Sequence, residues 1–222
     1  MIKSNIIVIS PHPDDLEIAM SGTVARLIES GYRIISIVVT DGRGSTNPNN
    51  LKIEDLVDMR KKEVQKSSQI LGIKDVVSFG FRNIKLESNQ AKLKIMLSEA
   101  FEKYKACEIY IPHPEIDKHQ THKIVADISI KVFKKSRTSR SVNTNIWCYE
   151  VWTPFPYYDR IEDISSYINI KTDAINAHKS QLLYKNYTEG ILGLNRYRAV
   201  FNDFKDKVES GYAEVFIKYN PD

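Results

Sequence analysis

Residues 6–15 of the chain read IIVISPHPDD, an apolar run followed at once by polar residues. Residues 6–9 are continuously apolar, which is typical of a parallel strand that is covered on both faces. His12, Asp14 and Asp15 follow where that strand would end. Open α/β sheets place their chemistry at the carboxyl ends of the strands. The stretch therefore predicts a central strand whose end carries one imidazole and two carboxylates.

The rest of the first 152 residues alternates between buried strands and amphipathic helices. Strands are predicted at residues 6–10, 34–40, 75–80, 108–112 and 146–152, and helices at about 16–28, 53–71, 91–104 and 121–134. This alternation is typical of βαβ units, so we expect an α/β fold with a Rossmann-like, mostly parallel sheet flanked by helices. Right-handed crossovers would place all the carboxyl ends of the strands on one side of the sheet.

The C-terminal part, residues 153–222, is less regular, and Pro154 and Pro156 separate it from the last predicted strand. Helices are predicted at residues 170–183 and at about 197–208. No linker or internal repeat stands out, and 222 residues suit one large domain. We therefore expect residues 1–222 to form a single domain.

Composition and charge exclude several classes of function. The net charge is +4 and both signs are mixed along the chain, which argues against nucleic acid as a partner. Neither a signal-peptide pattern nor an apolar run of membrane-spanning length is present, so we expect a cytoplasmic protein without stable membrane insertion. Cys107 and Cys148 are expected to be buried free thiols. A homo-oligomer remains compatible with the sequence.

A second polar cluster, DKHQTH at residues 117–122, complements the first. His12 and Asp15 are three residues apart, and so are His119 and His122, so each pair can face one point. A catalytic zinc site commonly has three nitrogen or oxygen ligands and an open position. Taken alone, His12 could be an ordinary hydrogen-bonded histidine, but the paired clusters favour a metal site. The spacing leaves open which aspartate and which histidine bind the metal.

The two clusters hold more groups than one metal needs. A free carboxylate beside the metal can serve as a general base, and a free histidine can stabilise an oxyanion. These groups suit metal-assisted hydrolysis of an amide or ester.

The chain resembles the PIG-L or LmbE-like de-N-acetylases, whose signature is HPDD followed later by D-[RK]-H-x-x-H. Residues 12–15 and 117–122 match these motifs, and the similarity extends over nearly the whole chain. It includes further family-like positions at residues 17–22, 40–42, 60, 63, 179–181 and 212–216. The resemblance implies a zinc-dependent enzyme that removes acetyl groups from N-acetylglucosamine-type sugars or glycoconjugates.

The resemblance also implies roles for individual residues. His12, Asp15 and His122 would bind Zn²⁺, with Fe²⁺ or Co²⁺ as other ions that such ligands accept. Asp14 would be the base that activates water. His119, as an imidazolium, would stabilise the oxyanion and help to protonate the leaving amine.

The chain departs from the family pattern at Thr121 and Asn83, and residues 113–116 make the segment before the second cluster one residue longer than usual. Thr121 stands where many members have an aspartate, and the weaker partner predicts a lower pKa for His119. Asn83 stands where many relatives have an aspartate that we expect to contact sugar hydroxyls, so Asn83 is a candidate for substrate binding.

Two arginines are further candidates for substrate binding. Arg43 either pairs with a phosphate or carboxylate of the substrate or is a solvated loop residue. For Arg60, an ion pair with Glu63 is slightly favoured over a substrate contact.

Two aromatic residues and a further histidine complete the candidates. Trp152 and Tyr157 could stack on a sugar ring, whereas His178 is expected on the surface or in packing.

Two alternatives to the sugar deacetylase remain. One is an amidase that acts on a non-sugar amide or thiol conjugate with the same metal site. The other is a catalytically silent module that binds metal or sugar, but binding alone does not need the base candidate Asp14.

Overall fold

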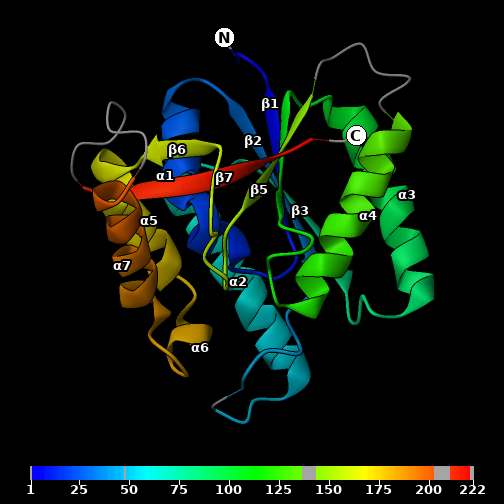
Figure 1. Ribbon diagram of the computed structural model, residues 1–222. Coiled ribbons are helices and arrows are strands. Elements are labelled where there is room, and N and C mark those ends of the chain that lie inside the picture. The colour runs from blue at the N-terminus through cyan, green and yellow to red at the C-terminus, as the bar shows by residue number, and fades with distance from the viewer. Residues whose placement is uncertain (1, 48, 137–143, 203–210, 221–222) are drawn as a thin grey trace.

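A computed structural model describes residues 2–47, 49–136, 144–202 and 211–220 of the chain. It contains a seven-stranded sheet in the order β3-β2-β1-β4-β5-β7-β6 (Figure 1). The first five strands are β1 (Asn5–Ser10), β2 (Arg33–Thr40), β3 (Asp75–Phe81), β4 (Glu108–Pro112) and β5 (Asn145–Tyr149). All of these pair in parallel. The predicted α/β fold with a mostly parallel sheet is confirmed.

Helices connect the parallel strands as the sequence predicts. They are α1 (Asp15–Glu29), α2 (Ile53–Leu71), α3 (Glu87–Tyr104) and α4 (Gln120–Ser136). Gly72 ends α2 with φ +78°, a left-handed conformation that glycine adopts without strain. None of the described helices combines the length and apolar character that crossing a membrane requires.

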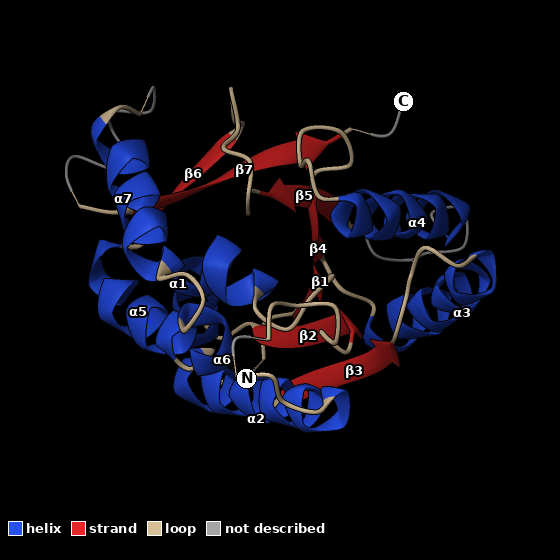
Figure 2. Ribbon diagram, turned by 90° about the horizontal axis from the view of Figure 1, so that it is seen from below, coloured by secondary structure: helices blue, strands red, loops and turns tan. Residues whose placement is uncertain are grey.

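Helices cover both faces of the sheet (Figure 2), and a separate hydrophobic cluster lies on each face. Ile7 and Ile9 of β1 belong to the cluster that includes α3 and α4, whereas Ile6 and Val8 belong to the cluster that includes α1 and α5 (Ile168–Asn176). Successive side chains of a strand point to opposite faces, so an unbroken apolar run serves both layers. This explains why the run at residues 6–9 forms the central strand.

The C-terminal part differs from the prediction in its strands. β5 ends at Tyr149, not at residue 152. Glu150 turns the chain away, because its buried carboxylate accepts hydrogen bonds from the Phe155 N–H and from Arg198. Two further strands, β6 (Arg160–Asp163) and β7 (Ala213–Tyr219), were not predicted, and β7 runs antiparallel to both neighbours.

The helices of this part also differ. The predicted helix at 170–183 is two helices, α5 and α6 (Lys179–Leu182), which are separated at Ala177 and His178. Helix α7 (Tyr187–Val200) begins ten residues before the helix that was predicted from residue 197. Residues 203–208 of that prediction lie outside the described residues.

The strand order has a reversal point next to β1. From β1 the chain moves to β2 and β3 on one side, and it later returns to β4 and β5 on the other. A crevice forms outside the carboxyl ends of the two strands at such a point, and ligands bind there in open α/β sheets. The two polar clusters follow β1 and β4, so both lie at this crevice.

Candidate metal centre

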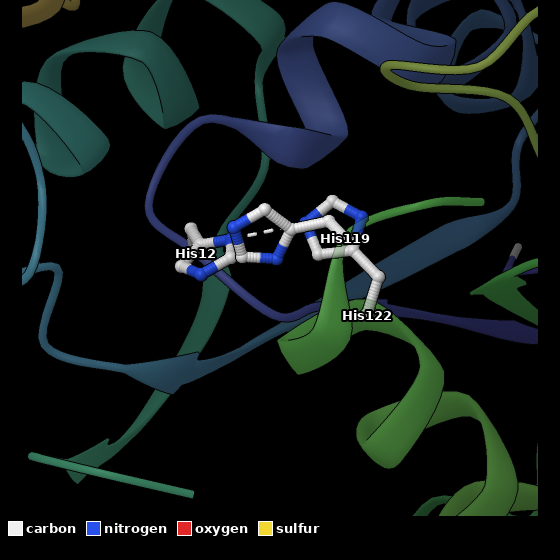
Figure 3. Close-up of side chains that lie close together, drawn as sticks. All are labelled: His12, His119 and His122. Carbon is white, nitrogen blue, oxygen red and sulfur yellow. Dashed lines mark hydrogen bonds between the residues drawn. The ribbon is translucent and has the colours of Figure 1, made fainter. Parts of the chain in front are cut away.

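Four candidate residues meet at the reversal point of the sheet. His12 lies in the turn after β1, and Asp15 is the first residue of α1. His119 directly precedes α4, and His122 lies in the first turn of that helix. In Figure 3 the rings of His12, His119 and His122 turn toward one another, although 110 residues separate His12 from His122.

Three donor atoms form a compact triangle at this point. His12 Nδ1 lies 3.0 Å from His122 Nε2, and Asp15 Oδ2 lies 3.2 Å from the first and 3.3 Å from the second. Zinc bonded to nitrogen and oxygen at roughly 2.0–2.1 Å holds tetrahedral ligands about 3.3–3.4 Å apart. The triangle therefore fits a small divalent cation with one open position.

The charges of the cluster also fit a cation. Burial opposes ionisation of Asp15, but His122 and His12 outweigh it and hold the pKa of the carboxyl well below its usual range. Burial likewise opposes charge on His122, but Asp15 and Asp117 raise the pKa of the imidazole to about 10. The other oxygen of Asp15, Oδ1, is buried and has no hydrogen-bond partner among the described residues. The carboxylates of Asp15 and Asp117 therefore place negative charge on both sides of the His122 ring, which favours a bound cation.

Asp117 contacts the ring nitrogen of His122 that does not belong to the triangle. Its Oδ2 lies 2.8 Å from His122 Nδ1, and its Oδ1 accepts a hydrogen bond of 2.8 Å from the backbone N–H of His119. A carboxylate behind a ligating histidine sets the tautomer and raises its basicity. The sequence analysis named Asp117 as part of the motif but assigned it no role.

His119 lies beside the triangle and is exposed. Its ring centroid is 4.8 Å from that of His12 and 4.7 Å from that of His122. The three histidines alone also satisfy the distances of a metal-binding group. The pKa of His119 is lowered by partial burial and then by the two neighbouring imidazoles. The sequence analysis also predicted a lower pKa for His119, but it gave Thr121 as the reason. The structure attributes the lower pKa to burial and to the neighbouring imidazoles.

Asp14 is the other carboxylate of the first motif. It occupies the residue before α1, where an aspartate commonly caps the helix, yet its carboxylate turns to other partners. Its Oδ2 lies 3.1 Å from the Arg60 guanidinium and accepts a long hydrogen bond of 3.4 Å from the Tyr187 hydroxyl. The carboxylate remains at the wall of the pocket beside the metal triangle.

The prediction that Arg60 forms an ion pair with Glu63 is wrong. Glu63 instead accepts hydrogen bonds from the N–H and the hydroxyl of Ser180, at 2.6 and 2.7 Å. Arg60 is 2% exposed and spans from α2 to Asp14 and to the carbonyl of Pro13. With both Glu63 oxygens engaged, the buried guanidinium pairs with the carboxylate that otherwise has no counter-charge.

A pocket of about 680 Å³ opens over the site, a volume typical of small-molecule sites. Of the substrate candidates, Arg43, Arg60 and Asn83 all line it. Arg43 already forms an ion pair with Asp41 at 2.8 Å, and the Asn83 Oδ1 accepts the backbone N–H of Lys85.

The two aromatic candidates for sugar stacking differ in their position relative to the pocket. Trp152 lines the pocket and packs edge-on against Tyr187, whereas Tyr157 is not among the lining residues.

Two predictions concern residues outside the pocket. For His178, the predicted alternative of a surface position is wrong, because this residue is fully buried, 3.5 Å from Glu17. Cys107 and Cys148 are free, as predicted; Cys148 is buried, whereas the predicted burial of Cys107 is wrong, because this residue is only partly buried.

Sequence reasoning missed several pocket residues. Tyr187 comes from the irregular C-terminal part, and no motif marks it. Arg82 and Lys85 follow β3, and Lys185 precedes α7; each is an ordinary surface residue by its local pattern. Only their common pocket distinguishes them.

Known proteins resemble this chain over most of its length. A family model described as GlcNAc-PI de-N-acetylase (PIG-L) matches residues 7–133. The diacetylchitobiose deacetylase of Thermococcus kodakarensis is 25% identical over 190 residues, which cover 79% of this chain and 69% of the relative. A probable N-acetyl-α-D-glucosaminyl L-malate deacetylase 2 of Bacillus anthracis is 25% identical over 225 residues, covering 92% and 98%.

Solved structures extend the likeness to the C-terminal part. The 4-carboxy-2-hydroxymuconate hydratase of Pseudomonas putida KT2440 superposes with a TM-score of 0.84, covers 99% of this chain and 97% of that one, and is 17% identical. At this identity the likeness concerns the fold alone, since one fold carries different chemistries. The family model, by contrast, spans more than half of the chain and both motifs of the site. The chain therefore belongs to the GlcNAc-PI de-N-acetylase (PIG-L) family.

Proposed function

We propose that the protein is a zinc-dependent hydrolase that removes the acetyl group from an N-acetylglucosamine-type sugar or its conjugate. The main support is the triangle of His12 Nδ1, Asp15 Oδ2 and His122 Nε2, with sides of 3.0–3.3 Å. The Asp14 carboxylate and the His119 imidazole lie beside it in the same pocket and do not belong to it. The two relatives described above are both named as deacetylases of N-acetylated sugars, which supports the substrate class.

In this proposal His12, Asp15 and His122 hold the metal. When bound, zinc would polarise the acetyl carbonyl and lower the pKa of water; Fe²⁺ or Co²⁺ would suit the same ligands. Asp117 holds the His122 ring in place through its Nδ1.

Asp14 acts as the general base. Its carboxylate faces the pocket, and the Arg60 guanidinium holds it in place from 3.1 Å. An ionised carboxylate can accept the proton of the water that attacks the acetyl carbon. Arg60 thereby positions a catalytic group rather than binding substrate.

His119 serves the other side of the reaction. It is exposed to the pocket, and its ring lies beside the rings of His12 and His122. A protonated ring there can stabilise the tetrahedral oxyanion and then protonate the leaving amine.

The test is acetate release from a panel of N-acetylated sugars, nucleotide sugars and lipid-linked sugars. Zinc-loaded protein should release acetate from at least one of them. Chelation should abolish the activity and added zinc should restore it. Asp14→Asn should lower kcat by about 10²- to 10⁴-fold, since general-base catalysis contributes roughly that much.

Asp127→Asn, which removes a carboxylate from the exposed face of α4, is the matched control and should retain full activity. Acetate released equally by the chelated protein or by Asp14→Asn would refute the mechanism.

A further inference from the structure

We propose that the substrate of this pocket carries an anionic group, a phosphate or a carboxylate, which binds to Arg82, Lys85 and Lys185. These three residues are called the basic rim below. The inference rests on the proposed function for the acetyl end of the substrate and adds the chemistry of its other end.

The pocket has an excess of positive charge. Five cationic side chains line it, against three carboxylates. Each carboxylate is already engaged: Asp15 with the two imidazoles, Asp14 with Arg60, and Asp41 with Arg43. The excess therefore lies entirely in the basic rim.

The rim cations lack counter-charges of their own. Within the described part of the chain, no ion pair joins Arg82, Lys85 or Lys185 to a carboxylate. All three are exposed, as binding groups at a pocket mouth must be. An anion at the mouth would relieve their mutual repulsion, whereas a neutral sugar would leave it in place.

Separate segments bring these cations together. Arg82 and Lys85 follow β3, and Lys185 lies about a hundred residues later, between α6 and α7. The β3 segment is held in shape, because Asn83 Oδ1 accepts the Lys85 N–H at 3.0 Å and the Asn83 carbonyl accepts Asn89 Nδ2 at 2.7 Å. Cations that converge on one mouth from distant segments form a recognition surface, unlike a run of charge along one helix face.

Asn83 contributes to the charge balance as well. It lines the pocket between Arg82 and Lys85 of the chain and carries no charge, so it offsets neither cation. An aspartate there would offset one of the cations, so the asparagine leaves the mouth more positive. Arginine and lysine both bind phosphate and carboxylate through charge-assisted hydrogen bonds.

The experiment compares substrates that share the acetamido sugar and differ in charge. Methyl N-acetylglucosaminide is the neutral probe, N-acetylglucosamine 1-phosphate and 6-phosphate carry phosphate, and N-acetylmuramic acid carries a carboxylate. Acetate release gives kcat and KM for each, and calorimetry on the Asp14→Asn protein gives binding without turnover. We expect at least one anionic probe to exceed the neutral probe about tenfold or more in kcat/KM, mainly through KM.

Two triple variants test the residues. Arg82→Gln/Lys85→Gln/Lys185→Gln should remove the preference and leave kcat/KM for the neutral probe within about twofold, because screened exposed charges act weakly on a neutral ligand. Lys61→Gln/Lys92→Gln/Lys94→Gln changes the net charge equally, uses exposed residues outside the pocket, and should keep the preference.

The outcomes separate this inference from the proposed function. Equal turnover of neutral and anionic probes, or a preference that survives in the rim variant, overturns the basic rim while the deacetylase stands. Tight, rim-dependent binding of an anionic probe without acetate release supports the rim and refutes the deacetylase. Absence of both binding and turnover for every anionic probe overturns the inference as well.

Discussion

Asp14 and Asp15 are adjacent and chemically identical, yet they have different surroundings. Successive residues at the start of a helix point about 100° apart, so the two carboxylates face different neighbours. Asp15 is fully buried between His12 and His122, whereas Asp14 faces the pocket and Arg60. In the proposed mechanism this dipeptide supplies both a metal ligand and a general base.

Asp117 offers a test of the support behind a ligand. Asp117→Asn removes the negative charge next to His122 Nδ1 and should weaken zinc affinity by about 10- to 100-fold, as is usual for such partners. Competition with a chromophoric chelator measures this affinity, and circular dichroism checks the fold. Asp127→Asn should leave the affinity unchanged, and equal affinities for the two variants would contradict the role of Asp117.

Helix α1 connects the metal site to the C-terminal part of the chain. The helix is interrupted at Met20, where φ is −149°. The N–H groups of Gly22 and Thr23 bond to the Glu214 carboxylate of β7, at 3.1 and 2.7 Å. The Lys171 ammonium of α5 donates hydrogen bonds to the Glu214 carboxylate and to the backbone carbonyl of Ile18. The backbone groups that lack helical hydrogen bonds at this interruption therefore bond to side chains of β7 and α5 instead.

Removal of Lys171 should be costly for this helix. Lys171→Met leaves the fully buried Glu214 carboxylate without its counter-charge and should lower the free energy of unfolding by about 3–5 kcal/mol. Urea unfolding followed by circular dichroism measures the change. The double variant Lys171→Met/Glu214→Gln should recover part of the loss, because it removes the uncompensated charge.

Lys94→Met on the exposed face of α3 is the control and should change stability by less than about 0.5 kcal/mol. A similarly small effect of Lys171→Met would show that the buried pair is not needed.

Stability of the whole molecule should depend on pH through a buried pair that joins α1 to the α5–α6 link. Burial lowers the pKa of His178, but Glu17 outweighs it and raises the pKa above 6.5. Burial raises the pKa of Glu17, but His178 and Ser67 outweigh it and lower the pKa below 4.5. The pair lies at 3.5 Å, beyond hydrogen-bond geometry for the ring, so we attribute the shifts mainly to charge.

The two shifts define a pH window. A raised histidine pKa contributes stability that is fully present below pH 6.5 and is lost as the pH rises through the folded-state pKa. A lowered glutamate pKa contributes stability that is present above pH 4.5 and is lost as the pH falls through the folded-state pKa. The pair therefore stabilises the fold most between these values.

We predict that the stability advantage of the wild type over His178→Gln is largest near pH 5.5 and shrinks toward pH 9. Urea unfolding of zinc-loaded protein across this range measures it. His113 is the matched control: burial lowers its pKa, so the advantage of the wild type over His113→Gln should grow with rising pH. A constant difference for His178→Gln would contradict the charged pair.

Local patterns sufficed for the sheet up to β5 and for the two site motifs. The strands at residues 6–10 and 108–112 were predicted with their bounds nearly unchanged, since burial on both faces leaves an unbroken apolar run. The convergence of His12 and His122 followed from parallel pairing alone, because all strand ends then lie on one side. The ligand assignment itself came from family resemblance and stays a prediction.

Contacts across long stretches of chain were beyond any local pattern. Arg60 pairs with Asp14 rather than with its helix neighbour Glu63, Tyr187 reaches Asp14 across 173 residues, and β7 inserts between β5 and β6. A buried charge selects whichever counter-charge the folded chain brings near it, and hydrophobic periodicity carries no information about that choice. Apolar spacing therefore predicts elements and the end of the sheet where chemistry occurs, whereas the partners of each buried ion arise only when distant segments pack together.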